Sequence, residues 1–123
     1  MTRILLVEDT PSLAAEIADI LRMEGFDVTL VSSGVDALNR LREQVTDIVI
    51  SDLFMYEIDG FQLITAIKND VRLKHIPIII LSARTTSDAI DKVKALGGDL
   101  FIKKPCDGKY LVSSIKKVLN QKD

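Results

Sequence analysis

Polar residues that could bind a metal ion or a phosphate follow short apolar runs at several places in this sequence. Glu8 and Asp9 follow the first such run, Asp52 follows the third, Ser82 the fourth and Lys104 the fifth. Three carboxylates that lie close together repel one another unless a cation compensates their charge. Oxygen ligands suit Mg²⁺, which takes one or two protein carboxylates and keeps several water molecules. If the fold brings these residues together, they predict a magnesium site.

The same residue types are suited to phosphoryl transfer. A carboxylate beside such a metal ion can act as a nucleophile and form an aspartyl phosphate. The transfer itself mainly requires positioning and neutralisation of the charge on the phosphoryl oxygens. A metal ion, the Ser82 hydroxyl and the Lys104 ammonium would provide both without a general base.

The apolar runs that precede these residues have the length and composition of β-strands. Each is rich in Ile, Val and Leu and is too short for a typical helix. The runs are residues 4–7, 28–31, 48–50, 78–81 and 100–102. The run at 78–81 does not alternate with polar residues, which indicates a strand covered on both faces, as in a parallel sheet.

Longer amphipathic segments separate these runs and indicate helices. Their apolar residues recur at helical spacing: Leu13, Ile17, Ile20 and Leu21; Val35, Leu38 and Leu41; Phe61, Ile64 and Ile67; Ile90, Val93 and Leu96; and Leu111, Ile115, Val118 and Leu119. Right-handed βαβ crossovers place such helices on both faces of a parallel sheet. We therefore predict an α/β fold, a doubly wound (βα)5 arrangement with a five-stranded parallel sheet. Ligands of such sheets bind at the carboxyl ends of the strands, where the polar residues would meet.

The composition indicates one ordinary globular domain over residues 1–123. The chain is 47% hydrophobic and 28% charged, a globular mixture that can form a core, and a length of 123 residues is that of one ordinary domain. A net charge of −2 excludes a protein held on nucleic acid by bulk charge, and the single cysteine excludes a disulfide framework. No apolar run is long enough to cross a bilayer, and the N-terminus turns acidic too early for a signal peptide. We expect a soluble, cytoplasmic protein with no membrane insertion and no direct contact with nucleic acid.

The order of these motifs resembles the receiver domain of two-component response regulators, of the single-domain chemotaxis type, over essentially the whole chain. The matching motifs are Glu8-Asp9, Asp52, Ser82-Ala83 and Lys104-Pro105, together with Asp59-Gly60-Phe61 and the stretch 97–101. Each motif alone is weak, but together and in this order they are highly specific. The resemblance implies the flavodoxin-like strand order 2-1-3-4-5.

The resemblance also implies a phosphoacceptor and a metal site. Asp52 would accept a phosphoryl group from a histidine kinase, a phosphotransfer protein or a small phosphodonor. Asp9, Asp52 and the backbone carbonyl of Phe54 would hold Mg²⁺, with Glu8 acting mainly through water. The chain would catalyse only its own phosphorylation and dephosphorylation, and would not be an enzyme in the usual sense.

Further residues of the resemblance would bind the phosphate and report its presence. Ser82, Ala83 and Lys104 would contact the phosphoryl oxygens. Phe101 occupies the aromatic switch position, and its ring would turn inward as Ser82 moves, although core packing is an alternative role for it. The surface of the fourth helix, fifth strand and fifth helix would then change for a downstream effector protein. If a receiver of 123 residues stands alone, it would pass its signal on by protein contact or by phosphorelay.

Two residues are expected to control the lifetime of the phosphate, and two others depart from the family pattern. Phe54 and Arg84 would overhang the site and restrict the approach of water, which would slow autodephosphorylation. Tyr56 stands where the family usually has proline, and Cys106 stands where it often has phenylalanine. We expect Cys106 to be a half-buried filler rather than a reactive thiol.

Other functions fit the sequence less well. A flavin-binding domain would need a phosphate-binding loop after the first strand, but Glu8 and Asp9 would repel a phosphate there. A phosphatase acting on free substrates would need a cap or a substrate pocket, and a nucleotide hydrolase would need a Walker loop, which is absent. A pseudo-receiver that binds partners without phosphorylation stays open because of Tyr56.

Overall fold

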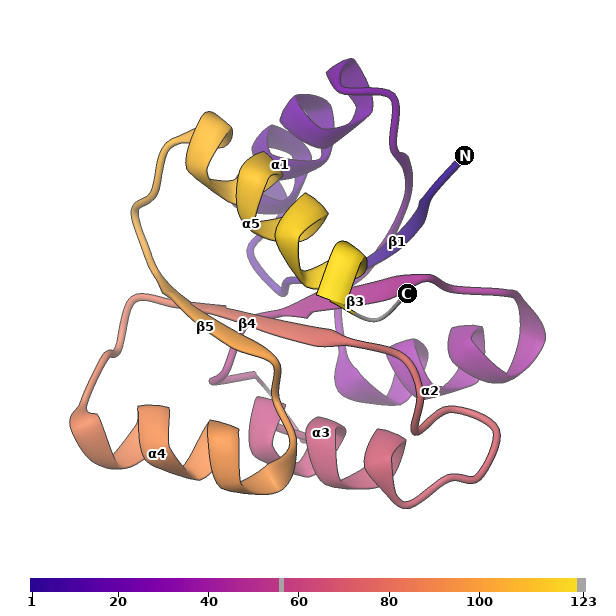
Figure 1. Ribbon diagram of the computed structural model, residues 1–123, viewed down its shortest axis with the longest axis vertical. Helices are drawn as coiled ribbons and strands as arrows, with labels where there is room; N and C mark the ends of the chain where they lie inside the picture. Colours follow the sequence, from indigo (N-terminus) through magenta and orange to yellow (C-terminus); the bar gives the residue numbers. More distant parts are fainter. Residues whose placement is uncertain (56, 122–123) are drawn as a thin grey trace.

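Five strands alternate with five helices in the computed structural model, which describes residues 1–55 and 57–121 (Figure 1). The elements are β1 (Arg3–Val7), α1 (Pro11–Met23), β2 (Asp27–Val31), α2 (Gly34–Glu43), β3 (Ile48–Ser51), α3 (Gly60–Lys68), β4 (Ile78–Ser82), α4 (Ser87–Leu96), β5 (Leu100–Lys103) and α5 (Gly108–Gln121). No helix in this described part of the chain is long and apolar enough to span a bilayer. The predicted alternation of five strands and five helices is confirmed.

The strands form one parallel sheet in the order β2-β1-β3-β4-β5. The register pairs Val7 of β1 with Ser51 of β3, and Ser82 of β4 with Lys103 of β5. The last residues of these strands therefore lie side by side at the carboxyl edge of the sheet. The strand order 2-1-3-4-5 that the family resemblance implied is confirmed.

Helices cover both faces of the sheet. Helices α1 and α5 lie on one face, and α2, α3 and α4 lie on the other (Figure 1). Successive side chains of a strand point to opposite faces, so in β1 Ile4 and Leu6 pack towards α1 and α5, whereas Leu5 and Val7 pack towards the other three helices. Two apolar layers result, and the doubly wound arrangement is confirmed.

The loop between β3 and α3 ends at a helix N-terminus with a capping box. The Asp59 side chain accepts a hydrogen bond from the backbone N–H of Gln62, and the Gln62 side chain accepts one from the backbone N–H of Asp59, each at 2.9 Å. The backbone N–H of Gly60 donates to the carbonyl of Leu53 at 2.7 Å. A Cβ atom at Gly60 would lie only 2.8 Å from the Cα of Leu53, so only glycine allows this approach. The start of α3 therefore holds the chain segment that directly follows Asp52.

Candidate functional site

The backbone hydrogen bonds of the sheet continue for one residue beyond the strands and bring the polar residues side by side. The backbone N–H of Asp52 donates to the carbonyl of Val7 at 3.1 Å, and that of Lys104 donates to the carbonyl of Ser82 at 2.9 Å. Glu8 directly follows Val7 in the chain. Residues that are up to 96 positions apart in the sequence therefore meet at one edge of the sheet. This convergence was predicted from the strand ends alone.

Three carboxylates form an acidic cluster at this edge. Glu8, Asp9 and Asp52 each offer one oxygen atom, and these atoms all lie within 4.8 Å of one another. Glu8 is buried, Asp52 is partly buried and Asp9 is exposed. Carboxylate oxygens at the border between protein and solvent suit a hard divalent cation that keeps some of its water. The donor set therefore fits Mg²⁺.

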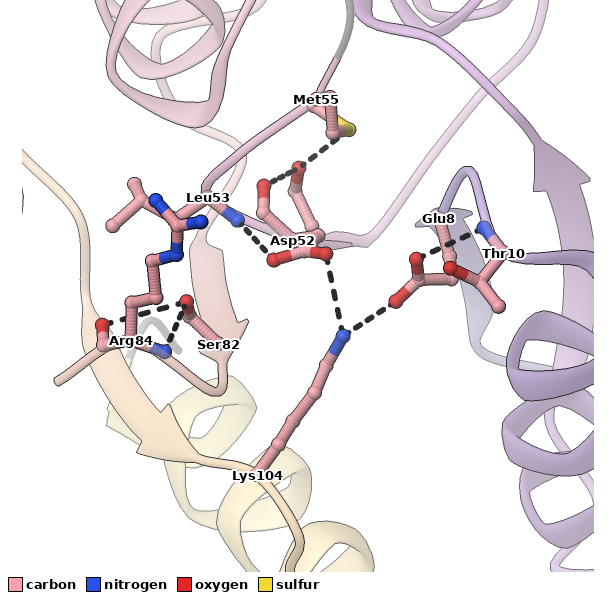
Figure 2. Close-up of polar contacts among 9 residues, drawn as sticks. Glu8, Thr10, Asp52, Leu53, Met55, Ser82, Arg84 and Lys104 are labelled. Carbon is pink, nitrogen blue, oxygen red and sulfur yellow. Dashed lines mark hydrogen bonds and ion pairs between the residues drawn. The ribbon is translucent and has the colours of Figure 1, made fainter.

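Lys104 contributes a cation to the cluster. Its Nζ atom lies 2.5 Å from Oε1 of Glu8 and 3.4 Å from Oδ2 of Asp52 (Figure 2). The second carboxylate oxygen of Glu8 accepts a hydrogen bond from the backbone N–H of Thr10 at 3.2 Å. A buried carboxylate is costly unless it is paired and hydrogen-bonded, and these two contacts meet that requirement for Glu8. Lys103, the adjacent lysine, is exposed.

Asp52 is held in place through several of its polar groups. Its Oδ1 atom accepts a hydrogen bond from the backbone N–H of Leu53 at 2.7 Å. Its carbonyl oxygen accepts one from the hydroxyl of Ser51 at 2.8 Å, and this hydroxyl lies 3.9 Å from the sulfur of Met55 (Figure 2). Ser51 is completely buried. Sequence reasoning assigned it no role, and its only signal was a polar residue at the end of an apolar strand.

Ser82 is buried at the same edge, where its hydroxyl contacts the backbone of the following loop. The N–H of Arg84 donates to Oγ of Ser82 at 3.2 Å, and Oγ in turn lies 3.5 Å from the carbonyl oxygen of Arg84 (Figure 2). Ala83, between them, is exposed. The Ser82 hydroxyl is therefore engaged with its own loop rather than with Asp52.

The two side chains that we expected to overhang the site contact one another. The guanidinium of Arg84 lies over the ring of Phe54, 4.9 Å from its centre. The Phe54 side chain is exposed, whereas Phe101 is partly buried against the core on the side of α2, α3 and α4. Tyr56, which departs from the family pattern, lies outside the described residues.

Cys106 lines an apolar pocket between α1 and the start of α5, together with Leu13, Ile17 and Leu111. Burial raises the pKa of its thiol, the nearby Asp107 raises it further, and Lys104 lowers it. Because the thiolate is the reactive form, a raised pKa makes this thiol poorly reactive. The environment agrees with the filler role that we expected for Cys106.

The fold and the edge residues together define a class of signalling domain. A parallel sheet in the order 2-1-3-4-5, with an acidic cluster, a hydroxyl and a lysine at its carboxyl edge, is the arrangement of receiver domains. The family model for the response regulator receiver domain matches residues 4–116, and the chain belongs to this family.

Two similar proteins are response regulators by name. The chain is 35% identical over 123 residues to the DNA-binding response regulator MtrA of Mycolicibacterium smegmatis. The aligned region covers 98% of this chain and 52% of that protein. The chain is 36% identical over 121 residues to the heme response regulator HssR of Staphylococcus aureus strain Newman, covering 98% of this chain and 53% of that protein. The chain therefore spans about half the length of the curated relatives it matches.

Solved receiver structures have the same fold. The signal receiver domain of a signal transduction histidine kinase from Syntrophus aciditrophicus superposes with a TM-score of 0.91 at 33% identity, covering 98% of this chain and 92% of that one. The chemotaxis response regulator CheY4 of Vibrio cholerae superposes with a TM-score of 0.90 at 26% identity, covering 96% and 98% of the two chains.

Proposed function

We propose that Asp52 is the phosphoacceptor of a cytoplasmic two-component signalling pathway. The observation that carries this proposal is the position of the Asp52 carboxylate beside two further carboxylates and a lysine. Oxygen atoms of Glu8, Asp9 and Asp52 lie within 4.8 Å of one another, and the Lys104 ammonium lies 3.4 Å from Oδ2 of Asp52. A carboxylate with a metal site and a cation beside it is suited to accept a phosphoryl group.

We assign Mg²⁺ as the cofactor. Asp9, Asp52 and the backbone carbonyl of Phe54 would hold the ion, and Glu8 would act through water. The pairing of Glu8 with Lys104 supports an indirect role for Glu8, because one of its oxygens already binds an ammonium. When bound, the ion would neutralise negative charge on the entering phosphoryl group.

The transfer would need no general base. A carboxylate oxygen of Asp52 would form the new bond to phosphorus. The bond from phosphorus to the donor, a histidine nitrogen of a kinase or phosphotransfer protein or the oxygen of an acyl phosphate, would break, and the donor would keep the electron pair. Lys104, Ser82 and Ala83 would contact the phosphoryl oxygens. In autodephosphorylation, water would attack phosphorus, the bond from phosphorus to the Asp52 oxygen would break with its electron pair staying on the carboxylate, and inorganic phosphate would leave.

The phosphorylated form would signal through its surface. Ser82 would turn towards the phosphate and Phe101 would follow, and the surface of α4, β5 and α5 would change for an effector protein. Phe54 and Arg84, which contact one another beside the site, would restrict the approach of water and set the lifetime of the phosphate. With its near-neutral charge, this domain would not bind nucleic acid itself.

Incubation with Mg²⁺ and acetyl phosphate, followed by intact mass measurement, tests the proposal. The wild-type chain is expected to gain one phosphoryl group, and Asp52→Asn is expected to gain none. Asp19→Asn, which changes an exposed carboxylate on α1, is the matched control and should be phosphorylated like the wild type. A folded wild-type chain that no phosphodonor modifies would instead be a pseudo-receiver, and the proposal would fail.

A further inference from the structure

Alternating cationic and aromatic side chains form a continuous array beside the candidate site. The Cζ atom of Arg84 lies 4.9 Å from the centre of the Phe54 ring. The Phe54 ring meets the Phe61 ring edge to face, with centroids 6.4 Å apart and planes at 89°. The Nζ atom of Lys92 lies 4.3 Å from the centre of the Phe61 ring. We call these four residues the cation–aromatic array.

Each contact in the array has a favourable geometry. A cation within about 6 Å of an aromatic ring centre is attracted by the negative face of the ring. Edge-to-face contact is a preferred arrangement of two rings. Because Phe54 and Phe61 each bind a cation and also contact one another, displacement of one member alters the surroundings of the next.

The array joins segments that are separate in the sequence. Phe54 lies in the loop after β3, Phe61 is on α3, Arg84 lies in the loop between β4 and α4, and Lys92 is on α4. Helix α4 is thereby linked to the aromatic pair at two places, through the loop that leads into it and through its central turns.

Ser82 connects the array to the phosphoacceptor. Its hydroxyl lies 3.5 Å from the carbonyl oxygen of Arg84 and accepts a hydrogen bond from the Arg84 N–H at 3.2 Å. A serine hydroxyl has one hydrogen to donate. If Ser82 donates to a phosphoryl oxygen on Asp52, it can no longer donate to Arg84. The backbone contact that holds the first member of the array is then weakened.

We propose that the cation–aromatic array transmits this change at Ser82 to α4, and that Phe61 and Lys92 are positioning residues for the α4 surface. The inference rests on the proposed function, since it requires a phosphoryl group at Asp52. The inference goes beyond the proposed function because it names side chains outside the phosphate site that carry the response to α4. Coupling of this kind is established only when a change in the connecting residues alters the response of the distant element.

Nuclear magnetic resonance of the full chain with Mg²⁺ and beryllofluoride, a mimic of the phosphoryl group, tests the inference. The amide signals of Asp52 and Lys104 report binding, and those of Ala89 to Val93 report the response of α4. In the wild type both groups of signals are expected to shift. In Lys92→Gln, beryllofluoride should bind within threefold of the wild-type affinity, but the shifts on α4 should fall to less than half.

Matched variants separate this role from general damage to the fold. Lys94→Gln removes another exposed lysine of α4 and should leave the α4 response intact, and Lys92→Arg keeps a cation above the ring and should restore it. Phe61→Leu keeps an apolar side chain without a ring face, and it should lower the response as Lys92→Gln does. Full α4 shifts in Lys92→Gln and in folded Phe61→Leu would overturn the inference. A wild-type chain that binds no beryllofluoride would contradict the proposed function itself.

Discussion

The ammonium of Lys104 is bound more closely to Glu8 than to Asp52. Its Nζ atom lies 2.5 Å from the Glu8 carboxylate and 3.4 Å from that of Asp52. The Glu8 side chain is only 2% exposed, against 14% for Lys104 and 16% for Asp52. The lysine therefore stabilises a buried charge and also lies beside the proposed metal site. Removal of the lysine should therefore have opposite effects on Mg²⁺ binding and on the stability of the metal-free fold.

Replacement of Lys104 by methionine should strengthen Mg²⁺ binding while it destabilises the metal-free fold. Repulsion between a unit charge and a divalent ion about 6 Å apart in water is about 1.4 kcal/mol, so removal of the charge should tighten binding about tenfold. Glu8 loses its cation, which should lower the free energy of unfolding without metal by up to roughly 3 kcal/mol. Isothermal calorimetry and urea unfolding at pH 7 measure the two effects. Lys103→Met is the matched control and should change neither; weaker Mg²⁺ binding by Lys104→Met would contradict the prediction.

Substitution of Gly60 by alanine should distort the segment after Asp52. The new Cβ would lie 2.8 Å from the Cα of Leu53 and 2.9 Å from the Asp52 carbonyl oxygen. Both are backbone atoms, so relief of these contacts requires the backbone to move, at a cost in free energy. We expect a loss of roughly 1–3 kcal/mol in stability together with weaker Mg²⁺ binding. Gly25→Ala is the control, because Gly25 has a φ of +92° but open space around it. Gly25→Ala should lose roughly 1–2 kcal/mol with unchanged Mg²⁺ binding, so equal metal affinities in the two variants would refute the prediction.

Removal of the Ser51 hydroxyl should loosen the backbone at Asp52. The Asp52 carbonyl would lose its hydrogen bond in a buried place, which costs about 1–2 kcal/mol. Ser51→Ala should also accept phosphate from acetyl phosphate more slowly than the wild type. Ser113→Ala removes an exposed hydroxyl of α5 that donates to the Tyr110 carbonyl, and it should leave both stability and rate nearly unchanged. A wild-type phosphorylation rate in Ser51→Ala would mean that the hydroxyl matters only to the fold.

Truncation of Arg84 should shorten the lifetime of the phosphorylated form. Arg84→Ala removes the side chain that covers the Phe54 ring, so water should reach the phosphorus atom more easily. Decay of the phosphorylated chain, followed by intact mass after removal of acetyl phosphate, measures the effect. Arg22→Ala, on α1, is a control at a distant position. An unchanged lifetime in Arg84→Ala would contradict this role.

Alkylation of Cys106 should be slow and should reveal its raised pKa. Burial favours the neutral thiol, so the folded chain keeps this proton to higher pH than the unfolded chain does. The resulting stabilisation is fully present below the ordinary thiol pKa and is lost as pH rises from there through the raised pKa of the folded chain. Iodoacetamide at pH 8 should therefore modify the native chain more slowly than the same chain in urea. Equal rates in the two states would show that the fold does not protect the thiol.

Much of this fold could be predicted because its signals are local. The first four residues of β4 are apolar, and the whole strand is buried, as is typical of a parallel strand covered on both faces. The convergence of Glu8, Asp52 and Lys104 followed from the rule that ligands bind at the carboxyl ends of parallel strands. These predictions depend on the order of elements and not on the conformation of any side chain.

Other features could not be predicted because they depend on side-chain conformations in the folded chain. Lys104 lies closer to Glu8 than to Asp52 because Glu8 is the more buried carboxylate, and a nearby cation stabilises a buried negative charge more strongly. The contact of Phe61 with Lys92 joins two helices at positions that resemble ordinary core and surface residues. Sequence spacing carries no information on such contacts between helices.

The strands that carry the site differ in how many neighbouring strands they pair with, and so in how rigidly they are held. The strands before Glu8 and Asp52 are β1 and β3, which pair with neighbours on both sides, whereas β5, before Lys104, is an edge strand that pairs only with β4. Displacement of β5 breaks one ladder of hydrogen bonds, and displacement of β1 or β3 breaks two. Glu8 and Asp52 thus follow strands that are paired on both sides, whereas Phe101 lies on β5 and Lys104 directly follows it, and this edge strand opens more easily. Amide hydrogens of β5 should therefore exchange with solvent before those of β1 and β3.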